Sequence, residues 1–355
     1  MHMNHRILLT LIQTGTLVFA AFFSVSAQDH DTIKNEHDHE SYSVRWVSQY
    51  PALTIKKEAS TEKDKDLNKR SSKKNKNWFT NLLFGKKPAD LIKPMSVLAN
   101  SPDLFWIADQ GIGSFFLVQN GVGEITQFRN KDIENLPSIV GSCFFQDDQI
   151  LFTDSKLNKI FQFLPGNKDL QIFNDSASLE QPTGIAYSVV NKEVWVSETK
   201  AHRLAVLNEK GEIIKRIGER GNGPGQFNFP TYIWIDNLGI VYVVDAMNFR
   251  IQIFDKNGNF VSSFGEIGDA SGYLSRPKGI ATDSYGHIYI ADALYHAIQV
   301  FDRTGKLLYV LGSQGEDKEQ FWMPTGIFID KNNFIYVADS YNSRVQIFKL
   351  DILYN

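Results

Sequence analysis

The sequence predicts an all-β fold, a six-bladed β-propeller of four-stranded antiparallel blades, for residues 88–350. Two observations predict it: a unit of about 47 residues recurs six times, and each unit contains four short strand patterns separated by turn residues. Four antiparallel strands in a repeat of this length are typical of a propeller blade. A single blade leaves both sheet faces exposed, whereas six blades in a ring cover each face with a neighbour.

Each repeat has two fixed points, an opening proline and a later carboxylate. The prolines are Pro94, Pro137, Pro182, Pro230, Pro277 and Pro324, and the carboxylates are Asp109, Asp154, Glu198, Asp245, Asp292 and Asp339. Because proline has no N–H to donate to a sheet, we expect each one to be the first residue of a strand. Glycine- and asparagine-rich stretches such as residues 236–239 and 255–258 predict the hairpin turns between strands.

The sixth repeat lacks a fourth strand, since its third strand pattern ends at Phe348 and few residues follow. Far upstream, Tyr42, Val44 and Trp46 alternate with other residues in the period-2 pattern of a strand. We therefore expect residues 42–50 to form the outer strand of the last blade and close the ring.

The first 27 residues have the pattern of a signal peptide. An uncharged run over residues 7–27 ends in Val25-Ser26-Ala27, the small residues that signal peptidase prefers. We expect cleavage and export, to the periplasm, the cell surface or the medium, with no stable membrane span afterwards. The alternative is an N-terminal membrane anchor, because a run of this length can just span a bilayer.

Two segments of biased composition precede the repeats. Residues 28–41 are rich in Asp, Glu and His, and we expect a disordered arm there rather than a metal site. Residues 51–87 are predicted to be a basic linker with a short amphipathic helix at 78–84. Residues 88–355 carry a net charge of −8 and the whole chain −3, which argues against nucleic acid as a partner. The single cysteine, Cys143, excludes a disulfide framework, and we expect it to be a small core residue.

The pattern Asp-x-x-Asn-x-Arg-[Ile/Val]-Gln occurs twice in full. Its residues are Asp245, Asn248 and Arg250 in one repeat and Asp339, Asn342 and Arg344 in another. We expect the asparagine to adopt the left-handed turn conformation and the arginine to fold back onto the aspartate within one hairpin. Because the pattern recurs, a structural role is favoured over a ligand-binding one.

These residues resemble the NHL-repeat family, and the glycine-rich loop before Pro230 is similar to the blade connection of that family. The resemblance covers about residues 42–350 and extends to exported bacterial six-bladed propellers with an N-terminal extension. It implies the propeller fold and leaves the activity open, because propellers host many unrelated functions.

The residues beside the opening prolines are expected to line one mouth of the central channel. Before the prolines stand Lys93, Leu136, Gln181, Phe229, Arg276 and Met323, and after them Met95, Ser138, Thr183, Thr231, Lys278 and Thr325. Neither set contains a carboxylate or a histidine, so we expect no metal, no cofactor and no catalytic residue at this mouth. We expect His202 and His296 to be solvated loop residues.

The face on which the motif loops and the blade connections meet, called the loop-rich face below, is the candidate binding surface. Its candidate residues are Phe249, Tyr295, His296, Tyr341, His202, Arg276, Lys278 and Arg220. Aromatic side chains beside arginine are typical of binding patches. The sequence therefore favours a monomeric, non-catalytic scaffold for a protein, peptide or glycan. The alternative is a lactonase-like or amidating-lyase-like propeller enzyme whose site the sequence does not reveal.

Overall fold

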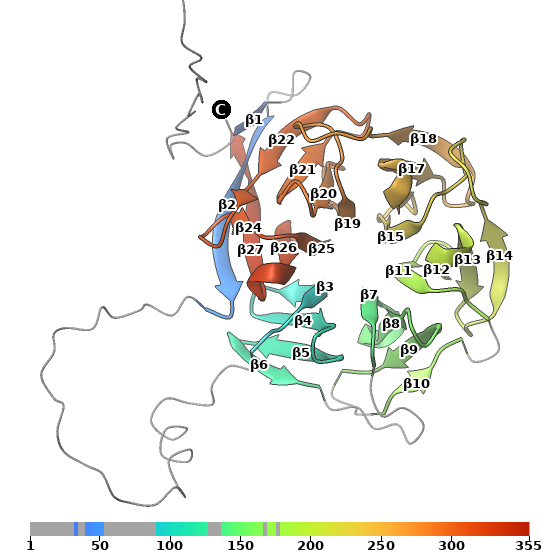
Figure 1. Ribbon diagram of the computed structural model, residues 1–355. Coiled ribbons are helices and arrows are strands. Elements are labelled where there is room, and N and C mark those ends of the chain that lie inside the picture. The colour runs from blue at the N-terminus through green and yellow to red at the C-terminus, as the bar shows by residue number, and fades with distance from the viewer. Residues whose placement is uncertain are drawn as a thin grey trace, which may run out of the picture. The chain divides into compact units, whose positions relative to one another are not determined.

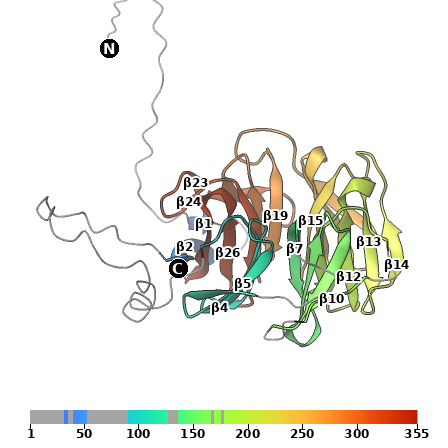
Figure 2. The ribbon, with the colours of Figure 1, turned by 60° about the horizontal axis from the view of Figure 1, so that its bottom comes forward.

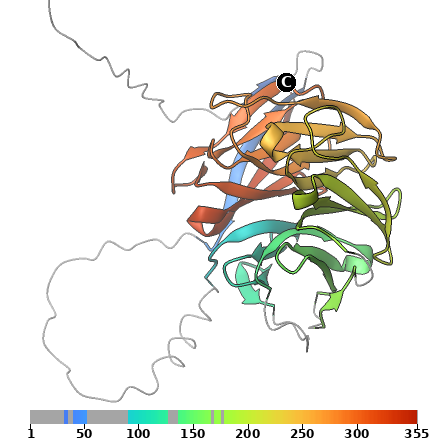
Figure 3. The same ribbon diagram turned by 45° about the vertical axis from the view of Figure 1, so that its right-hand side comes forward.

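The computed structural model describes residues 32–34, 40–52, 90–126, 136–165, 169–174 and 178–354. Five four-stranded antiparallel sheets and one five-stranded sheet form the six blades, which confirms the predicted all-β propeller. Each innermost strand lies beside that of the next blade, and the innermost strand of the last blade lies beside that of the first, so the ring is closed (Figures 1, 2 and 3). None of the described residues belongs to a helix long and apolar enough to cross a membrane.

The strands of each blade are given from the channel outwards. Blade 1 has β3 (Pro94–Ser101), β4 (Leu104–Asp109), β5 (Ser114–Gln119) and β6 (Val122–Ile125); blade 2 has β7 (Ile139–Phe144), β8 (Ile150–Asp154), β9 (Lys159–Phe163) and β10 (Gln171–Ile172); blade 3 has β11 (Pro182–Ser188), β12 (Glu193–Glu198), β13 (Arg203–Asn208) and β14 (Ile213–Ile217). Blade 4 has β15 (Pro230–Ile235), β16 (Val241–Asp245), β17 (Arg250–Phe254) and β18 (Phe260–Phe264); blade 5 has β19 (Pro277–Thr282), β20 (Ile288–Asp292), β21 (Ala297–Phe301) and β22 (Leu307–Leu311). Blade 6 has β25 (Pro324–Ile329), β26 (Phe334–Asp339), β27 (Arg344–Tyr354), β2 (Glu40–Tyr50) and β1 (Thr32–Lys34).

Short elements connect these strands. The strands β23 (Ser313–Gln314) and β24 (Gln320–Phe321) pair in parallel between blades 5 and 6. Four single-turn 3₁₀ helices are described, η1 (Gln146–Asp148), η2 (Thr199–Ala201), η3 (Ala246–Asn248) and η4 (Ser340–Asn342). The last three occupy the loops between the second and third strands of their blades, and η3 and η4 lie in the two full copies of the Asp-x-x-Asn-x-Arg pattern.

The N-terminal segment closes the ring as predicted. Strand β2 pairs antiparallel with β27, from Glu40 opposite Tyr354 to Tyr50 opposite Val345, and lies along it in Figure 1. Tyr42, Val44 and Tyr50 of β2 are buried, with 3%, 9% and 2% of their surface exposed.

The predicted boundaries of the N-terminal segments need one correction. Residues 32–34 and 40–41, inside the arm expected to be disordered, lie in strands, because β27 is 11 residues long and offers an edge to pair along. The predicted signal peptide lies outside the described residues, as do most of the linker and the helix at 78–84.

The prediction that each opening proline is the first residue of an inner strand is confirmed for five blades and is wrong for the second. The inner strand of blade 2 begins at Ile139, which pairs with Asp154 as Pro182 pairs with Glu198. Its register is therefore shifted by two residues relative to Pro137. The residues at the channel mouth in this blade are Ser138 and Val140, and this set again contains no carboxylate or histidine.

The inner strands approach one another closely at their third residue. Gly141, Gly184, Gly279 and Gly326 hold this position in blades 2, 3, 5 and 6. A Cβ at any of them would lie 2.2–2.4 Å from a backbone oxygen of the next blade. Glycine therefore permits the tight waist of the channel.

Candidate functional site

The inner strands run from the loop-rich face to the opposite face. In blade 4, Pro230 pairs with Asp245 at the start of the motif loop, and Ile235 pairs with Val241 across the turn that ends the strand. We call the face that carries these second-end turns the turn face. Side chains at the two ends of the inner strands therefore belong to two different mouths of the channel.

Tyr232 separates these two mouths. It is the third residue of β15, the position that is glycine in four other blades, and only 8% of its surface is exposed. Its hydroxyl donates a hydrogen bond to the backbone oxygen of Met95, 3.4 Å away on the opposite blade of the ring, and its ring packs in one cluster with Val140. Burial raises the pKa of the Tyr232 hydroxyl, so it remains a donor at neutral pH. Its side chain thus blocks the channel at its waist.

A cavity of about 950 Å³, called the central cavity below, lies between Tyr232 and the turn face. Half-buried aromatic side chains from four blades line it: Phe144, Tyr187, Trp234 and Phe328. The Phe328 ring packs edge to face on Trp234 at 5.7 Å and on Phe144 at 6.1 Å between centroids. Cys143 also lines this cavity and is partly buried, so it is a wall residue as well as a packing residue.

Four aspartates line the cavity near the turn face, and one of them, Asp148 of blade 2, is exposed. The other three are Asp236, Asp283 and Asp330, one in each of blades 4 to 6. In each, one carboxylate oxygen accepts backbone N–H groups of its own turn, for example those of Leu238 and Ile240 at 2.9 Å for Asp236. The other oxygen accepts a tyrosine hydroxyl of the second strand, at 3.3, 3.1 and 3.0 Å respectively. These carboxylates therefore fix the turns. Over the described residues, no three His, Cys, Asp or Glu side chains gather as a metal site.

The loop-rich mouth carries three cations, Lys93, Arg276 and Lys278, called the basic cluster below. Burial, together with the positive charges of Arg276 and Lys93, lowers the pKa of the Lys278 ammonium to about 8. The Lys93 ammonium donates to Gln110 Oε1 at 3.0 Å. Lys278 is one position closer to the loop-rich face than Tyr232, so the cluster lies on the other side of the blockage from the central cavity.

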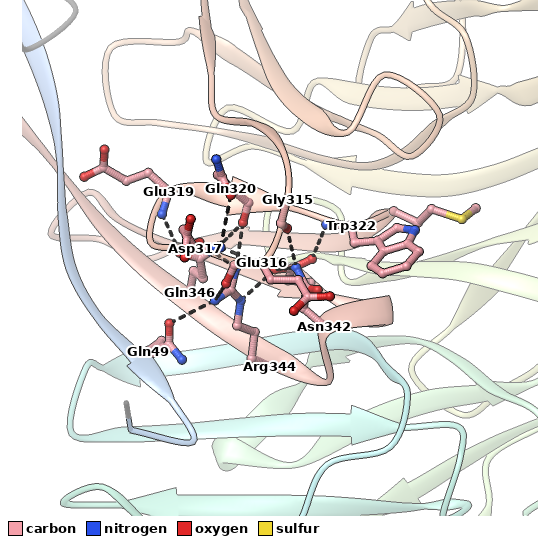
Figure 4. A network of polar contacts seen from close by, with 12 residues as sticks. Gln49, Gly315, Glu316, Asp317, Glu319, Gln320, Trp322, Asn342, Arg344 and Gln346 are labelled. Atoms are coloured by element: carbon pink, nitrogen blue, oxygen red, sulfur yellow. Dashed lines mark hydrogen bonds and ion pairs between the residues drawn. The ribbon is translucent and has the colours of Figure 1, made fainter. Parts of the chain in front are cut away.

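The Asp-x-x-Asn-x-Arg pattern forms a bonded network that ties the motif loop to the preceding blade connection (Figure 4). In blade 6, Arg344 Nε and Asn342 Nδ2 each donate to Asp339 Oδ2 at 2.8 Å. The remaining Arg344 nitrogens donate to the backbone oxygens of Glu316, Asp317 and Gln320 and to Gln49 Oε1 of β2. The blade 4 network repeats the same geometry, and its members are Asp245, Asn248, Arg250 and the backbone oxygens of residues 221–226.

The expected left-handed asparagine is wrong. The left-handed residue is the next one, Phe249 or Ser343, with φ of 53° or 50°. The asparagine stays in the 3₁₀ turn because its amide bridges the aspartate and a backbone oxygen of the blade connection, Gly221 for Asn248 and Gly315 for Asn342. Cross-loop bonding thus outweighs the local preference of asparagine.

The histidines are not solvated loop residues, contrary to expectation. His202, 9% exposed, and His296 occupy the left-handed position, and each Nδ1 accepts the N–H of the residue before the next proline, Phe229 or Met323, at 3.1 Å. His287 is buried and bonds through Nδ1 to Asp283 Oδ2 at 2.7 Å. Each of these rings joins neighbouring segments.

The other candidate residues lie on the loop-rich face, and none of them lines the central cavity. Arg220 and Arg276 are exposed, Phe249 is half-buried, and the Tyr295 hydroxyl is 2.7 Å from Ser271 Oγ. Tyr341 is 57% exposed and stacks on Trp322, with 6.4 Å between ring centroids.

We did not predict from the sequence the four half-buried aromatic side chains that line the central cavity, Phe144, Tyr187, Trp234 and Phe328. A signal for two of them exists, because Trp234 and Phe328 stand at the fifth inner-strand position, where blades 3 and 5 have Ala186 and Ala281.

The fold and the channel define this chain as a six-bladed β-propeller. Residues 174–262 match the DUF5128 family, described as a 6-bladed beta-propeller, and residues 321–348 match the NHL repeat. The chain is thus a six-bladed propeller that contains an NHL repeat. A comparison with curated proteins gives no match.

Solved structures share the fold at low sequence identity. Virginiamycin B lyase from Staphylococcus aureus is 14% identical over 74% of this chain and 97% of its own, with a TM-score of 0.54. An auxiliary nutrient binding protein from Bacteroides ovatus is 14% identical over 74% of this chain and 70% of its own, with a TM-score of 0.56. A protein of unknown function from Bacteroides thetaiotaomicron is 12% identical over the same shares, with a TM-score of 0.59. At this identity they support the fold alone.

Proposed function

We propose that this protein is an exported, non-catalytic binding propeller that holds the apolar or aromatic part of a ligand in its central cavity. The observation that supports it is the blind shape of that cavity, closed by Tyr232 and walled by aromatic side chains from four blades. Its volume, about 950 Å³, is in the range of ligand pockets, and aromatic walls with a few polar groups are typical of them. The signal-peptide pattern of residues 1–27 supports export.

The state of the rim carboxylates favours binding over hydrolase or lyase chemistry. A general acid or base needs a free oxygen within hydrogen-bond reach of the reacting group. In Asp236, Asp283 and Asp330, both oxygens already accept hydrogen bonds from turn N–H groups or tyrosine hydroxyls. The fourth carboxylate, Asp148, is exposed to solvent at the rim. The aromatic walls of the cavity therefore offer an apolar surface and no reactive group.

The loop-rich face is a second candidate, for a protein, peptide or glycan partner of a monomeric scaffold. It is supported by the stacked pair of Trp322 and Tyr341, which are 41% and 57% exposed. Exposed aromatic pairs of this kind supply contact area at a low cost in side-chain entropy.

Cys143 gives a direct test, because it is the only cysteine of the chain and lines the central cavity. Burial raises the pKa of its thiol, so methyl methanethiosulfonate should modify it slowly. Bound N-phenyl-1-naphthylamine, a neutral aromatic probe, should slow the modification further, as measured by intact mass. Phe328→Ala should weaken binding of the probe about tenfold, through loss of contact area, and Tyr341→Ala should not change it. Binding without protection of Cys143, or equal loss in both variants, would place the probe elsewhere and contradict the proposal.

A further inference from the structure

The basic cluster, Lys93, Arg276 and Lys278, differs in charge from the equivalent residues of the other blades. We compare the residues just before and just after the first residue of each inner strand. Apart from the three cations, all of them are uncharged: Ser138, Gln181, Phe229, Met323, Met95, Val140, Thr183, Thr231 and Thr325. The three cations come from blade 1 and blade 5, on the two sides of blade 6. Positive charge is thus concentrated at one mouth of a region whose net charge is −8.

No carboxylate of the described residues forms an ion pair with these cations. The aspartates that pair with the opening prolines of these two blades, Asp109 and Asp292, accept hydrogen bonds from the backbone instead. Asp292 Oδ1 accepts the N–H of Arg276 at 2.8 Å, and Asp109 accepts the N–H of Lys93 at 3.0 Å. Both aspartates are fully buried, and within the described part of the chain neither Arg276 nor Lys278 has an anionic partner.

The inner strands of the two blades that carry these cations, β3 and β19, both pack against β25, so only one inner strand separates them around the ring. The positive charges of Arg276 and Lys93 also disfavour the charged form of Lys278. Holding like charges together at a partly buried site costs free energy, and a bound anion would offset this cost with charge-assisted hydrogen bonds. One more donor lies at the same level, the Thr231 hydroxyl of the adjoining strand, which is buried and has no hydrogen-bond partner in the described structure.

We infer that the loop-rich mouth of the channel binds a small oxyanion with two negative charges, such as phosphate or the phosphate group of an ester. Lys278 and Arg276 contact the anion from blade 5, and Lys93 contacts it from blade 1. Tyr232 closes the channel beneath it, so this site is separate from the central cavity. A single cluster at one mouth suits one small group, whereas nucleic acid requires a basic stripe along the surface.

Calorimetric titration of the full chain with inorganic phosphate at pH 7 and low salt tests this site. We expect phosphate to bind and to raise the melting temperature. Lys278→Met should weaken binding at least tenfold and abolish the thermal shift. Without phosphate this variant should melt no lower than the unmodified protein, because it relieves repulsion within the cluster, and this comparison separates lost binding from lost folding.

Lys210→Met is the matched control, because Lys210 is an exposed lysine on the turn face. It should bind phosphate as the unmodified protein does. A titration with ribose 5-phosphate distinguishes an ester from the free ion as the preferred ligand. The inference is wrong if phosphate neither binds nor raises the melting temperature, if both lysine variants lose binding equally, or if a single-stranded oligonucleotide binds where phosphate does not.

Discussion

Removing strand β2 is expected to cost most of the stability of the ring. Among its described residues, the buried hydrophobic side chains Tyr42, Val44 and Tyr50 each contribute roughly 1.5–3 kcal/mol by burial, or about 5–9 kcal/mol together. A folded domain is typically stable by only about 5–15 kcal/mol. A chain that starts after Ala52 should therefore unfold at a much lower urea concentration. It should also aggregate, because the 11-residue β27 would present an open edge.

The assay is urea unfolding followed by circular dichroism, with sedimentation velocity to detect aggregates. A synthetic peptide of residues 40–52, added in excess, should restore the unfolding midpoint by pairing with β27, since a ligand that binds only the folded state stabilises it. Arg45→Ala is the matched control on the same strand. Its ion pair with Asp351, 2.6 Å long, is half-exposed and is worth less than about 1 kcal/mol. An unchanged midpoint in the truncated chain, or no rescue by the peptide, would refute the closing role of β2.

Three further predictions concern the motif network and the channel. Arg344→Met should destabilise the protein by about 3–5 kcal/mol in urea unfolding, because it leaves the buried Asp339 carboxylate without its guanidinium partner; a loss below 1 kcal/mol would contradict this. Burial alone would raise the pKa of Glu198, but hydrogen bonds from Arg203 and Arg216 outweigh burial and lower the pKa. The stabilising contribution of Glu198 is therefore present above the ordinary carboxyl pKa and is lost as the pH falls through the lowered value. Arg203→Met should accordingly move acid unfolding to higher pH, and an unmoved midpoint would count against the pairing. Tyr232→Gly should cost about 3–5 kcal/mol and speed modification of Cys143 by opening the channel, whereas an unchanged rate would show that Tyr232 is not the barrier.

Most of the fold could be predicted because its signals are local and repeated. The alternation of Tyr42, Val44 and Trp46 identified a strand, and the incomplete sixth repeat identified where it pairs. The two-residue shift in blade 2 could not be predicted from Pro137, because register depends on which residues face the neighbouring blades and not on the proline itself.

The candidate site was harder to predict, since it depends on distances across the ring. Nothing near Tyr232 in the chain indicates that its hydroxyl reaches Met95 on the opposite blade. Likewise, His202 lies in a segment with the composition of an exposed loop. It is nevertheless buried, and its ring accepts a backbone N–H from the next blade connection. A sequence pattern reports the local conformation, and tertiary partners decide the exposure of such side chains.

Comparing equivalent positions across the blades separates structural from functional side chains. A residue that recurs at one position in most blades is kept by the geometry of the ring, as the waist glycines of four blades show. A residue that breaks the repeat is not required by that geometry. Tyr232 stands where four blades have glycine, Trp234 and Phe328 stand where blades 3 and 5 have alanine, and Lys278 stands where the other five blades have uncharged residues. These departures gather along one axis, the central channel, on both sides of Tyr232. Their convergence in space, which the repeat itself does not require, is the reason to look for the ligands of this propeller in its channel.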